Sequence, residues 1–305
     1  MRASKNTSFH FEHQAMATQF TLAIVDQDPE DAKWAALQCF KRLDELELKL
    51  SRFVPDSDIS RINTLKADEQ LLLDRETWEV MKLAIQVQQW TQGAFDIGVA
   101  EHMNIFRATK QGILNEFEMA LALEKAQKHK LKASLYLDPS EPKFYCMKEG
   151  MQFDLGGIGK GYALDQLASV MKTQGIQNYS IGAGNSTFLS VGVDAQGNPW
   201  QHTLASETMK NTILANNFGI SASGTFHQGN HIFDPRTGKN RLVSAVDRLW
   251  VAATNATLAD ALSTGLYLLS IPEIETLAEN LDEIRWVYYS KDGKLFRTSQ
   301  NSVNL

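Results

Sequence analysis

Residues 154–165 read Asp-Leu-Gly-Gly-Ile-Gly-Lys-Gly-Tyr-Ala-Leu-Asp. The residues around the start of this block, 152–155, predict a strand, and the apolar stripe after the glycines predicts a helix that ends near Gly175. Four glycines between a strand and a helix can expose backbone N–H groups that bind an anion such as phosphate. A glycine turn needed only for close packing fits the same pattern, so both interpretations stay open.

Two well-known phosphate-binding loops do not match this block. A P-loop requires Ser or Thr directly after its lysine, but Gly161 follows Lys160. The dinucleotide fingerprint requires a third glycine at the position where Tyr162 stands. The block therefore predicts neither a P-loop kinase nor a dinucleotide-binding sheet.

Helical patterns dominate the sequence before the block. Asp28 and Pro29 open a helix with an N-cap and a proline at its first position. A second helix is predicted over 75–90, with Gly93 beyond its end, and a third begins after Asn115. The expected core stripe of the first helix is Leu37, Phe40, Leu43, Leu46 and Leu50.

Strand patterns dominate after the block, where no charged residue occurs between positions 174 and 193. A further helix is predicted to begin near Thr257, and 284–289 with 294–297 predict a hairpin. Helices that gather early and strands that gather late, without regular alternation, predict an α+β fold. Because the chain shows no repeat or Pro/Ser-rich linker, we expect one domain over residues 1–305 with a core at 16–290.

The charge of the chain argues against nucleic-acid binding. Lys and Arg total 30 against 36 Asp and Glu, which gives a formal net charge of −6. The nearest approach to a basic cluster, residues 125–132, falls at the end of the third predicted helix, where Lys125, Lys128 and Lys130 match the helix dipole. We therefore expect no nucleic-acid partner.

The chain lacks an apolar run of the roughly 18 residues that a membrane span requires, and its first 14 residues are polar. We expect neither membrane insertion nor a signal peptide. Cys39 and Cys146 lie far apart and form neither a disulfide framework nor a CxxC metal motif. These features predict a cytoplasmic protein if Met1 is the natural start; an exported protein trimmed of its leader would show the same features.

Asp260 and Thr264 form a candidate metal pair. In a helix they lie one turn apart on the same face, where a carboxylate and a hydroxyl could bind a hard cation such as Mg²⁺. Thr257 and Asp260 also fit a helix-capping box that requires no metal. Spacing alone leaves both interpretations open.

Residues 231–238 read His-Ile-Phe-Asp-Pro-Arg-Thr-Gly. A tight turn at 235–238 would bring His231, Asp234 and Arg236 into one neighbourhood. A lone histidine is usually structural or solvated, and the Gly-Asn pair before His231 disfavours a helical His-x-x-x-His metal site.

Taken in order, these segments resemble the flavin transferases of the ApbE family, the FAD:protein FMN transferases. The similarity extends from Met16 to Tyr267, and the succession of motifs carries it more than any single motif. The matching motifs are Met16-Ala17-Thr18, Ser51-Arg52-Phe53 with residues 57–63, Gly93-Ala94-Phe95-Asp96, residues 154–165, residues 231–238 and residues 259–264.

The resemblance implies a Mg²⁺-dependent enzyme, with Ca²⁺ as a second candidate metal. Such an enzyme cleaves the FAD pyrophosphate, attaches FMN to a Thr or Ser of an acceptor flavoprotein and releases AMP. The implied metal ligands are Asp260, Thr264 and the main-chain oxygen of Gly159. The implied catalytic residues are His231, as a candidate base, Asp260 and Lys160. The implied FAD contacts are Met16, Phe53, Gly93, Phe95, Asp96, Gly157, Lys160, Asp165, Ser223, Gly224, His231, Asp234, Arg236 and Thr237.

Two alternatives share the same motifs. One is a Mg²⁺-dependent FAD pyrophosphatase, in which water replaces the protein hydroxyl, and the other is a non-catalytic FAD-binding protein. Ser186 and Thr225 stand where many family members carry Asp, so the chain differs from the family pattern at two nucleotide-facing segments. We expect loss of Asp260 to reduce turnover more than loss of His231, because electrostatic stabilisation of a phosphoryl transition state exceeds the contribution of a base.

Overall fold

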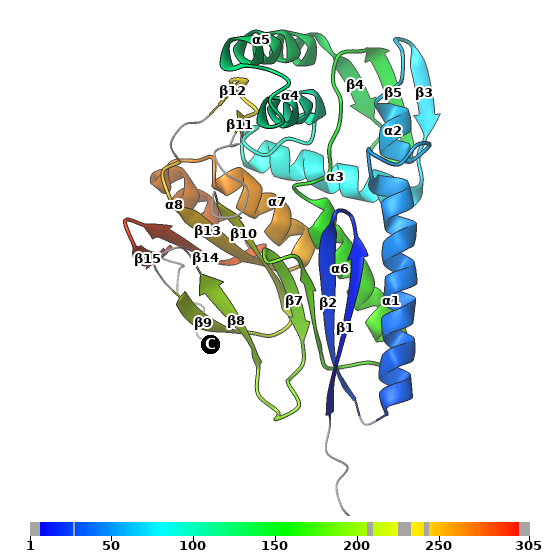
Figure 1. The fold of residues 1–305 in the computed structure, drawn as a ribbon, viewed down its shortest axis with the longest axis vertical. Helices are drawn as coiled ribbons and strands as arrows, with labels where there is room; N and C mark the ends of the chain where they lie inside the picture. Colours follow the sequence, from blue (N-terminus) through cyan, green and yellow to red (C-terminus); the bar gives the residue numbers. More distant parts are fainter. Residues whose placement is uncertain (1–6, 27, 206–209, 225–232, 241–243, 299–305) are drawn as a thin grey trace, which may run out of the picture.

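Eight antiparallel strands form the central sheet of the computed structural model, in the order β1-β2-β6-β7-β10-β13-β14-β15 (Figure 1). The structure describes residues 7–26, 28–205, 210–224, 233–240 and 244–298. Two short hairpins, β8-β9 and β11-β12, and a three-stranded sheet, β3-β5-β4, complete the strands. The strands are β1 Thr7–Ala15, β2 Thr18–Asp26, β3 Glu69–Leu72, β4 Ser134–Leu137, β5 Lys143–Lys148, β6 Tyr179–Ala183, β7 Thr187–Val191, β8 Trp200–Ala205, β9 Lys210–Ala215, β10 Phe218–Gly224, β11 Phe233–Asp234, β12 Lys239–Asn240, β13 Arg248–Ala253, β14 Ile284–Lys291 and β15 Lys294–Arg297.

A helical layer covers one face of the central sheet. α1 packs on β1, β2 and α6, and α7 packs on α6, β10 and β13. The smaller sheet lies beyond one end of α1, next to α2, α4 and α5 (Figure 1). The helices are α1 Pro29–Leu50, α2 Asp58–Ile62, α3 Arg75–Trp90, α4 Ala100–Lys110, α5 Glu116–Lys132, α6 Gly159–Thr173, α7 Ala256–Leu266 and α8 Ile271–Asn280.

Local signals position the ends of several elements as the sequence predicted. The Asp28 side chain accepts a hydrogen bond from Glu30 N at the start of α1. Asn115 and Glu118 form a reciprocal capping box on α5. Gly175, with φ +78°, terminates α6, which supports the predicted glycine stop.

The α+β prediction is confirmed, since the strand-rich second half supplies six of the eight central strands and the first half supplies most helices. The β1-β2 hairpin is the exception, because it comes from the start of the chain and adds two strands at the edge of that sheet. Helices α2, α4 and α8 were not predicted.

The predicted core stripe of α1 is wrong in part, and the predicted strand at residues 152–155 is wrong. Leu37 is 49% exposed, because the buried face of α1 instead runs through positions such as Ala36, Cys39 and Leu43. Residues 152–155 form no strand. The Asn63 side chain replaces a neighbouring strand there: its amide accepts from Phe153 N at 2.6 Å and donates to Phe153 O at 2.9 Å.

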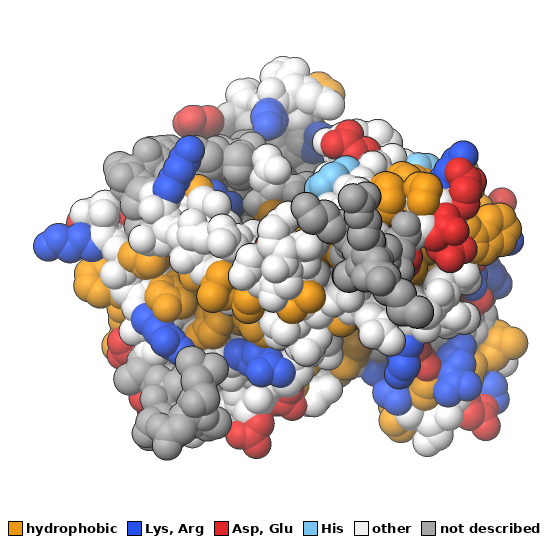
Figure 2. All heavy atoms as spheres, turned by 90° about the horizontal axis from the view of Figure 1, so that it is seen from below, with side chains coloured by type: hydrophobic (Ala, Val, Ile, Leu, Met, Phe, Trp, Pro, Cys, Tyr) orange, Lys and Arg blue, Asp and Glu red, His pale blue; other side chains and the backbone are white. Residues whose placement is uncertain are grey.

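The surface findings concern only the described part of the chain. Every helix in it is too short or too polar to cross a lipid bilayer. On the face that Figure 2 shows, basic side chains are interspersed with acidic ones, so this face presents no continuous basic field among the residues that are coloured there. Cys39 and Cys146 are both free thiols and are both buried. The sequence predicted no disulfide between them and did not predict their burial.

Candidate active site

Asp260 is the buried acid around which the site is built. It lies on α7 and is 3% exposed. Its Oδ1 accepts hydrogen bonds from Thr187 at 3.2 Å and Ser221 at 3.1 Å, and its Oδ2 accepts from Gly161 N at 3.0 Å. These donors come from β7, β10 and α6, so three elements fix the orientation of the carboxylate. All three donors are neutral, which leaves its negative charge to be balanced by a cation.

Lys160 provides a positive charge next to this carboxylate. Its Nζ lies 3.5 Å from Asp260 Oδ1 and donates a hydrogen bond to Gly156 O at 3.1 Å. The side chain is 24% exposed, so its ammonium reaches solvent while the acid does not. The pair therefore places a charged donor at the border between the buried acid and the surface.

Thr264 and Gly157 extend the site along α7. Thr264 Oγ1 donates to Asp260 O at 3.1 Å, one helical turn back. A β-carbon on Gly157 would lie 3.5 Å from Thr264 Oγ1 and 3.2 Å from the Phe95 ring, so these three residues meet. The predicted cofactor contacts Gly157 and Phe95 are thus next to the predicted metal ligand Thr264.

The donor chemistry of this site fits a small hard cation. A carboxylate and a hydroxyl are oxygen ligands of the kind that Mg²⁺ prefers, and the Asp260 carboxylate has only one cationic neighbour, Lys160, among the ion pairs of the described residues. Within the same residues, no three His, Cys, Asp or Glu side chains cluster as a metal site. A cation here would therefore depend on Asp260, on hydroxyl and carbonyl oxygens, and on its substrate.

The glycine block is largely occupied by internal packing. Gly161 allows α6 and α7 to touch, since a β-carbon there would lie 2.1 Å from Ala256 O. Gly156 N donates to Asp154 Oδ1, Gly159 N donates to Leu155 O and Gly161 N donates to Asp260. Most N–H groups of the block thus have partners within the protein. The structure supports the interpretation that these glycines serve close packing. An anion at this block would be bound mainly by the Lys160 ammonium.

Asp165 forms hydrogen bonds with the first residues of α7. Its carboxylate accepts hydrogen bonds from Ala256 N at 2.9 Å and Thr257 N at 2.8 Å, and a further one from the Thr257 hydroxyl. Burial raises the pKa of Asp165, and these hydrogen bonds oppose that shift. Both carboxylate oxygens of Asp165 thus accept hydrogen bonds from the N-terminus of α7. Contact between Asp165 and FAD stays a prediction.

The predicted capping box at Thr257 and Asp260 is wrong. α7 begins earlier, and Asn255 is its N-cap, with a side chain that accepts from Leu258 N. Thr257 donates its hydroxyl to Asp165 instead of capping. Asp260 is therefore not required to cap α7.

A chain of hydroxyl groups connects the predicted contact Ser223 to the acid. Ser223 Oγ lies 3.0 Å from Ser263 Oγ, which donates to Ser221 Oγ at 3.3 Å, and Ser221 donates to Asp260. Gly224, also predicted to contact FAD, ends β10 next to Arg248. Sequence reasoning missed Thr187 and Ser221, because no local motif connects these strand residues to α7.

The turn at residues 233–238 lies beside the loop that follows α3. The Asp234 carboxylate forms an ion pair with the Arg236 guanidinium, with 2.8 Å between Oδ2 and Nη2. The main-chain oxygen of Asp234 accepts hydrogen bonds from Thr237 N and Gly238 N. Arg236 also donates to Leu268 O at 3.3 Å, and a β-carbon on Gly93 would lie 3.5 Å from Arg236 Cγ. His231, the predicted base, lies outside the described residues.

Lys130 has a role that the sequence did not indicate. The helix-dipole pattern predicted a lysine in the last turn of α5, but Lys130 is 9% exposed, and its Nζ lies 2.6 Å from Asp96 Oδ2. Asp96, a predicted FAD contact, therefore has a cationic partner inside the protein. No signal in the sequence marked Lys130 as different from Lys125 or Lys128.

Met16 and Phe53 lie toward the edges of this region. Met16 and Ala17 form the β1-β2 turn, both with positive φ, next to Gly184 at the end of β6. The sheet register places this turn near Thr187, since β2 pairs with β6 and β6 with β7. Phe53 is 60% exposed, and the guanidinium of Arg52 lies 4.2 Å from its ring centroid. FAD contact by either residue stays a prediction.

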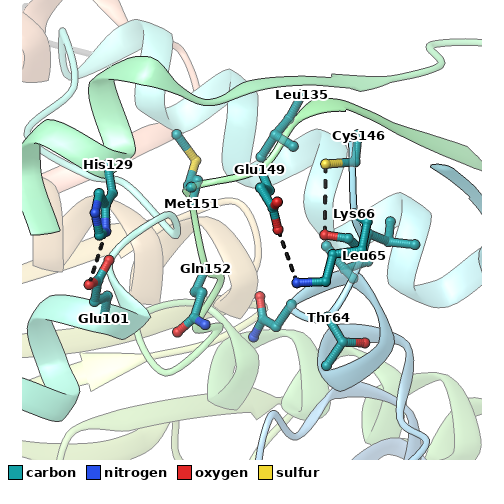
Figure 3. A pocket seen from close by; sticks show the side chains of 13 residues that line it. Thr64, Leu65, Lys66, Glu101, His129, Leu135, Cys146, Glu149, Met151 and Gln152 are labelled. Atoms are coloured by element: carbon teal, nitrogen blue, oxygen red, sulfur yellow. Dashed lines mark hydrogen bonds and ion pairs between the residues drawn. The ribbon is translucent and has the colours of Figure 1, made fainter. Parts of the chain in front are cut away.

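A separate cavity of about 430 Å³ opens between the smaller sheet, α4 and α5 (Figure 3). Two pairs of polar side chains lie in it: Lys66 Nζ is 3.1 Å from Glu149 Oε2, and His129 Nδ1 is 3.4 Å from Glu101 Oε1. Among the described residues that line it, none is a predicted site residue. The cavity therefore adds no residue to the site around Asp260.

Several known proteins are similar to this chain in sequence or in fold. A protein from Klebsiella pneumoniae named FAD:protein FMN transferase is 27% identical over 96% of this chain and 87% of its own length. A Vibrio cholerae protein of the same name is 26% identical over 85% of this chain and 81% of its own length. Two solved structures share the fold with a TM-score of 0.82 each: the flavin transferase ApbE of Vibrio cholerae, 23% identical over 96% of this chain and 98% of its own, and the apo flavinyl transferase ApbE of Pseudomonas stutzeri, 22% identical over 98% of this chain and 96% of its own.

The family model described as the ApbE family matches residues 16–288, which include Asp260, Thr264, Lys160 and the turn at 233–238. A match over this share of the sequence is decisive for membership. The chain belongs to the ApbE family.

Proposed function

We propose that this chain is a Mg²⁺-dependent FAD:protein FMN transferase, which attaches FMN through a phosphoester to a Thr or Ser of an acceptor flavoprotein. The names of its relatives support this activity. The observation that carries the proposal is the buried Asp260 carboxylate, held by neutral donors and approached by Lys160 at 3.5 Å.

The proposed reaction is a phosphoryl-group transfer. The acceptor hydroxyl oxygen forms a bond to the phosphorus on the FMN side of the pyrophosphate. The bond from that phosphorus to the bridging oxygen breaks, and AMP leaves with the electron pair. The hydroxyl proton passes to a base, for which His231 is the candidate. Such a reaction needs positive charge near the phosphates and a fixed geometry more than covalent chemistry by the protein.

Asp260 and Thr264 would hold the cation, with the main-chain oxygen of Gly159 as the third proposed ligand. A divalent cation bound there supplies charge compensation for the pyrophosphate and for the leaving oxygen. Lys160 adds a fixed positive charge at the mouth of the site, where its ammonium is already placed by Gly156 O. A preorganised group of this kind contributes about 3 to 4 kcal/mol of transition-state stabilisation.

Intact-mass spectrometry of a candidate acceptor tests the proposal. After incubation with this protein, FAD and Mg²⁺, the acceptor is expected to gain the mass of FMN less one water, and AMP is expected to accumulate in equal amount. EDTA should prevent the gain and Asp260→Asn should slow it by about 10²- to 10³-fold, while Asp282→Asn, at an exposed acid, should label the acceptor at the wild-type rate.

Two outcomes would contradict the proposal. Release of AMP and free FMN, without labelling of any of several flavoprotein acceptors, would identify a pyrophosphatase. Bound FAD that survives prolonged incubation with Mg²⁺ and acceptor would identify a non-catalytic FAD-binding protein.

A further inference from the structure

Lys130 differs from the other lysines of α5 in being inside the protein. Lys125 and Lys128 are exposed, whereas Lys130 is 9% exposed. Its Nζ forms an ion pair with Asp96 Oδ2 at 2.6 Å and donates to Pro235 O at 3.3 Å. A lysine that served only the helix dipole would remain in water, since burial of an ammonium costs several kcal/mol unless partners compensate it.

The two partners of Lys130 belong to segments that are distant in the sequence. Asp96 stands in the loop after α3, and its other oxygen, Oδ1, accepts from Gly98 N at 2.6 Å. Pro235 stands in the turn after β11, where Asp234 O accepts from Thr237 N and Gly238 N. One ammonium therefore joins the loop 93–98 to the turn 233–238.

Neighbouring residues of α4 and α5 hold the same turn. Gln127 Nε2 donates to Pro235 O at 3.4 Å, and a β-carbon on Gly238 would lie 2.8 Å from Gln127 Cβ. The His102 ring stacks on Phe233 with a centroid distance of 4.4 Å. The turn is thus packed against α4 and α5. Of Gln127, His102 and Lys130, Lys130 is the residue whose ion pair also reaches the loop 93–98.

That loop connects this contact to the site. Phe95 meets Gly157, and a β-carbon on Gly265 of α7 would lie 2.9 Å from Phe95 Cβ. If the turn 233–238 moved relative to the loop 93–98, the turn would therefore also move relative to Thr264, one residue before Gly265. Displacements of about 1 Å in positioning groups can reduce rates by about 10²-fold.

We propose that Lys130 is a positioning residue of the flavin-transfer site, which fixes the turn 233–238 against the loop 93–98. This role rests on the proposed function, because both segments carry residues predicted to contact FAD. Lys130 itself touches neither Asp260 nor Lys160 in the contacts of the described residues; it acts through Asp96 and Pro235.

Hydrogen exchange of the ligand-free protein tests the positioning directly. Lys130→Met removes the ammonium and keeps much of the apolar stem, and Lys125→Met is the matched control on the same helix. We expect faster amide exchange at residues 233–238 in Lys130→Met only, because Thr237 N and Gly238 N lose the constraint on their turn. Equal exchange at these residues in both variants would overturn the proposal.

A double variant separates positioning from general destabilisation. Lys130→Met alone leaves the Asp96 carboxylate buried without its cation, whereas Asp96→Asn with Lys130→Met removes both charges. We expect the double variant to recover thermal stability while exchange at 233–238 stays fast. Because Asp96 is itself a predicted FAD contact, the kinetic measurement uses Lys130→Met alone, for which we expect the KM for FAD to rise about tenfold or more with a smaller change in kcat. If exchange at 233–238 returns to the wild-type rate together with stability in the double variant, or if the KM of Lys130→Met equals that of the wild type, Lys130 has only a structural role.

Hydrogen exchange and the measurement of FMN transfer together distinguish a failure of this proposal from a failure of the proposed function. If the wild-type protein transfers no FMN, the proposed activity fails, while the exchange experiment still reports whether Lys130 fixes the turn. If the wild-type protein is active and exchange at 233–238 is unchanged in both Lys130 variants, the positioning role fails alone.

Discussion

The Nζ of Lys160 lies 3.5 Å from Oδ1 of Asp260, because α6 and α7 approach each other at Gly161. A β-carbon on Gly161 would lie 2.1 Å from Ala256 O and 2.8 Å from Asp260 Cβ. The absence of a side chain at Gly161 therefore permits the charge pair between Lys160 and Asp260. The same contact explains why Gly161 N can donate to Asp260.

Gly161→Ala should separate the two helices and destabilise the protein. Overpacking against a backbone carbonyl is expected to lower the free energy of unfolding by about 2 kcal/mol or more. Gly159→Ala is the matched control on the same helix, since its β-carbon would meet only Leu155 Cβ at 3.8 Å. Urea unfolding of both variants measures the difference, and equal stability of the two would show that the helices are not in contact at Gly161.

Asp260→Asn should be the most damaging single substitution in the site. It removes the negative charge that the proposed cation requires, and we expect kcat for AMP release to fall by about 10²- to 10³-fold. His231→Ala should cost less. Circular dichroism and thermal unfolding control for folding, because Asp260 is buried; the opposite order of activities in folded variants would contradict the electrostatic account.

Because the His102 side chain is buried, the protein should lose stability as the pH falls and His102 is protonated in the unfolded chain. Burial, with a further contribution from the nearby Lys130 ammonium, lowers the pKa of His102 from 6.5 to about 4. Between these values the unfolded chain binds more protons than the folded protein, so stability is full above about pH 6.5 and falls as the pH decreases toward 4. The contribution to the slope is at most about 1.4 kcal/mol per pH unit.

Urea unfolding at several pH values in this window checks the sign. His102→Asn should reduce the pH dependence of the unfolding free energy, whereas His10→Asn, at an exposed histidine, should leave it unchanged. His202, whose pKa burial also lowers to about 4, contributes in the same direction and remains in both variants. An unchanged slope in His102→Asn would mean that His102 titrates normally in the folded protein.

Features that depend on neighbouring residues were predictable from the sequence. Asn115 and Glu118 sit three positions apart and cap α5 by themselves, and Asp292 and Gly293 adopt the positive φ angles that the β14-β15 hairpin requires. The helical period also predicts that Asp260 and Thr264 lie one turn apart, as they do in α7, where the Thr264 hydroxyl donates to the main-chain oxygen of Asp260. Binding of a cation by the two side chains stays a prediction.

Features that depend on distant residues could not be predicted in this way. Residues 152–155 have a strand-like sequence, but Asn63 supplies the partners of Phe153 from another part of the chain. Lys130 matches a dipole pattern locally and is buried only because Asp96 and Pro235 fold onto it. The same holds for Thr187 and Ser221, which reach Asp260 through the register of the central sheet.

The most direct test of the central claim is an anomalous difference map from a crystal of the protein with FAD and Mn²⁺ in place of Mg²⁺. We predict a metal peak about 2 Å from an Asp260 carboxylate oxygen and from Thr264 Oγ1, in contact with the pyrophosphate. A peak bound by other residues, or a pyrophosphate held away from α7, would contradict the account.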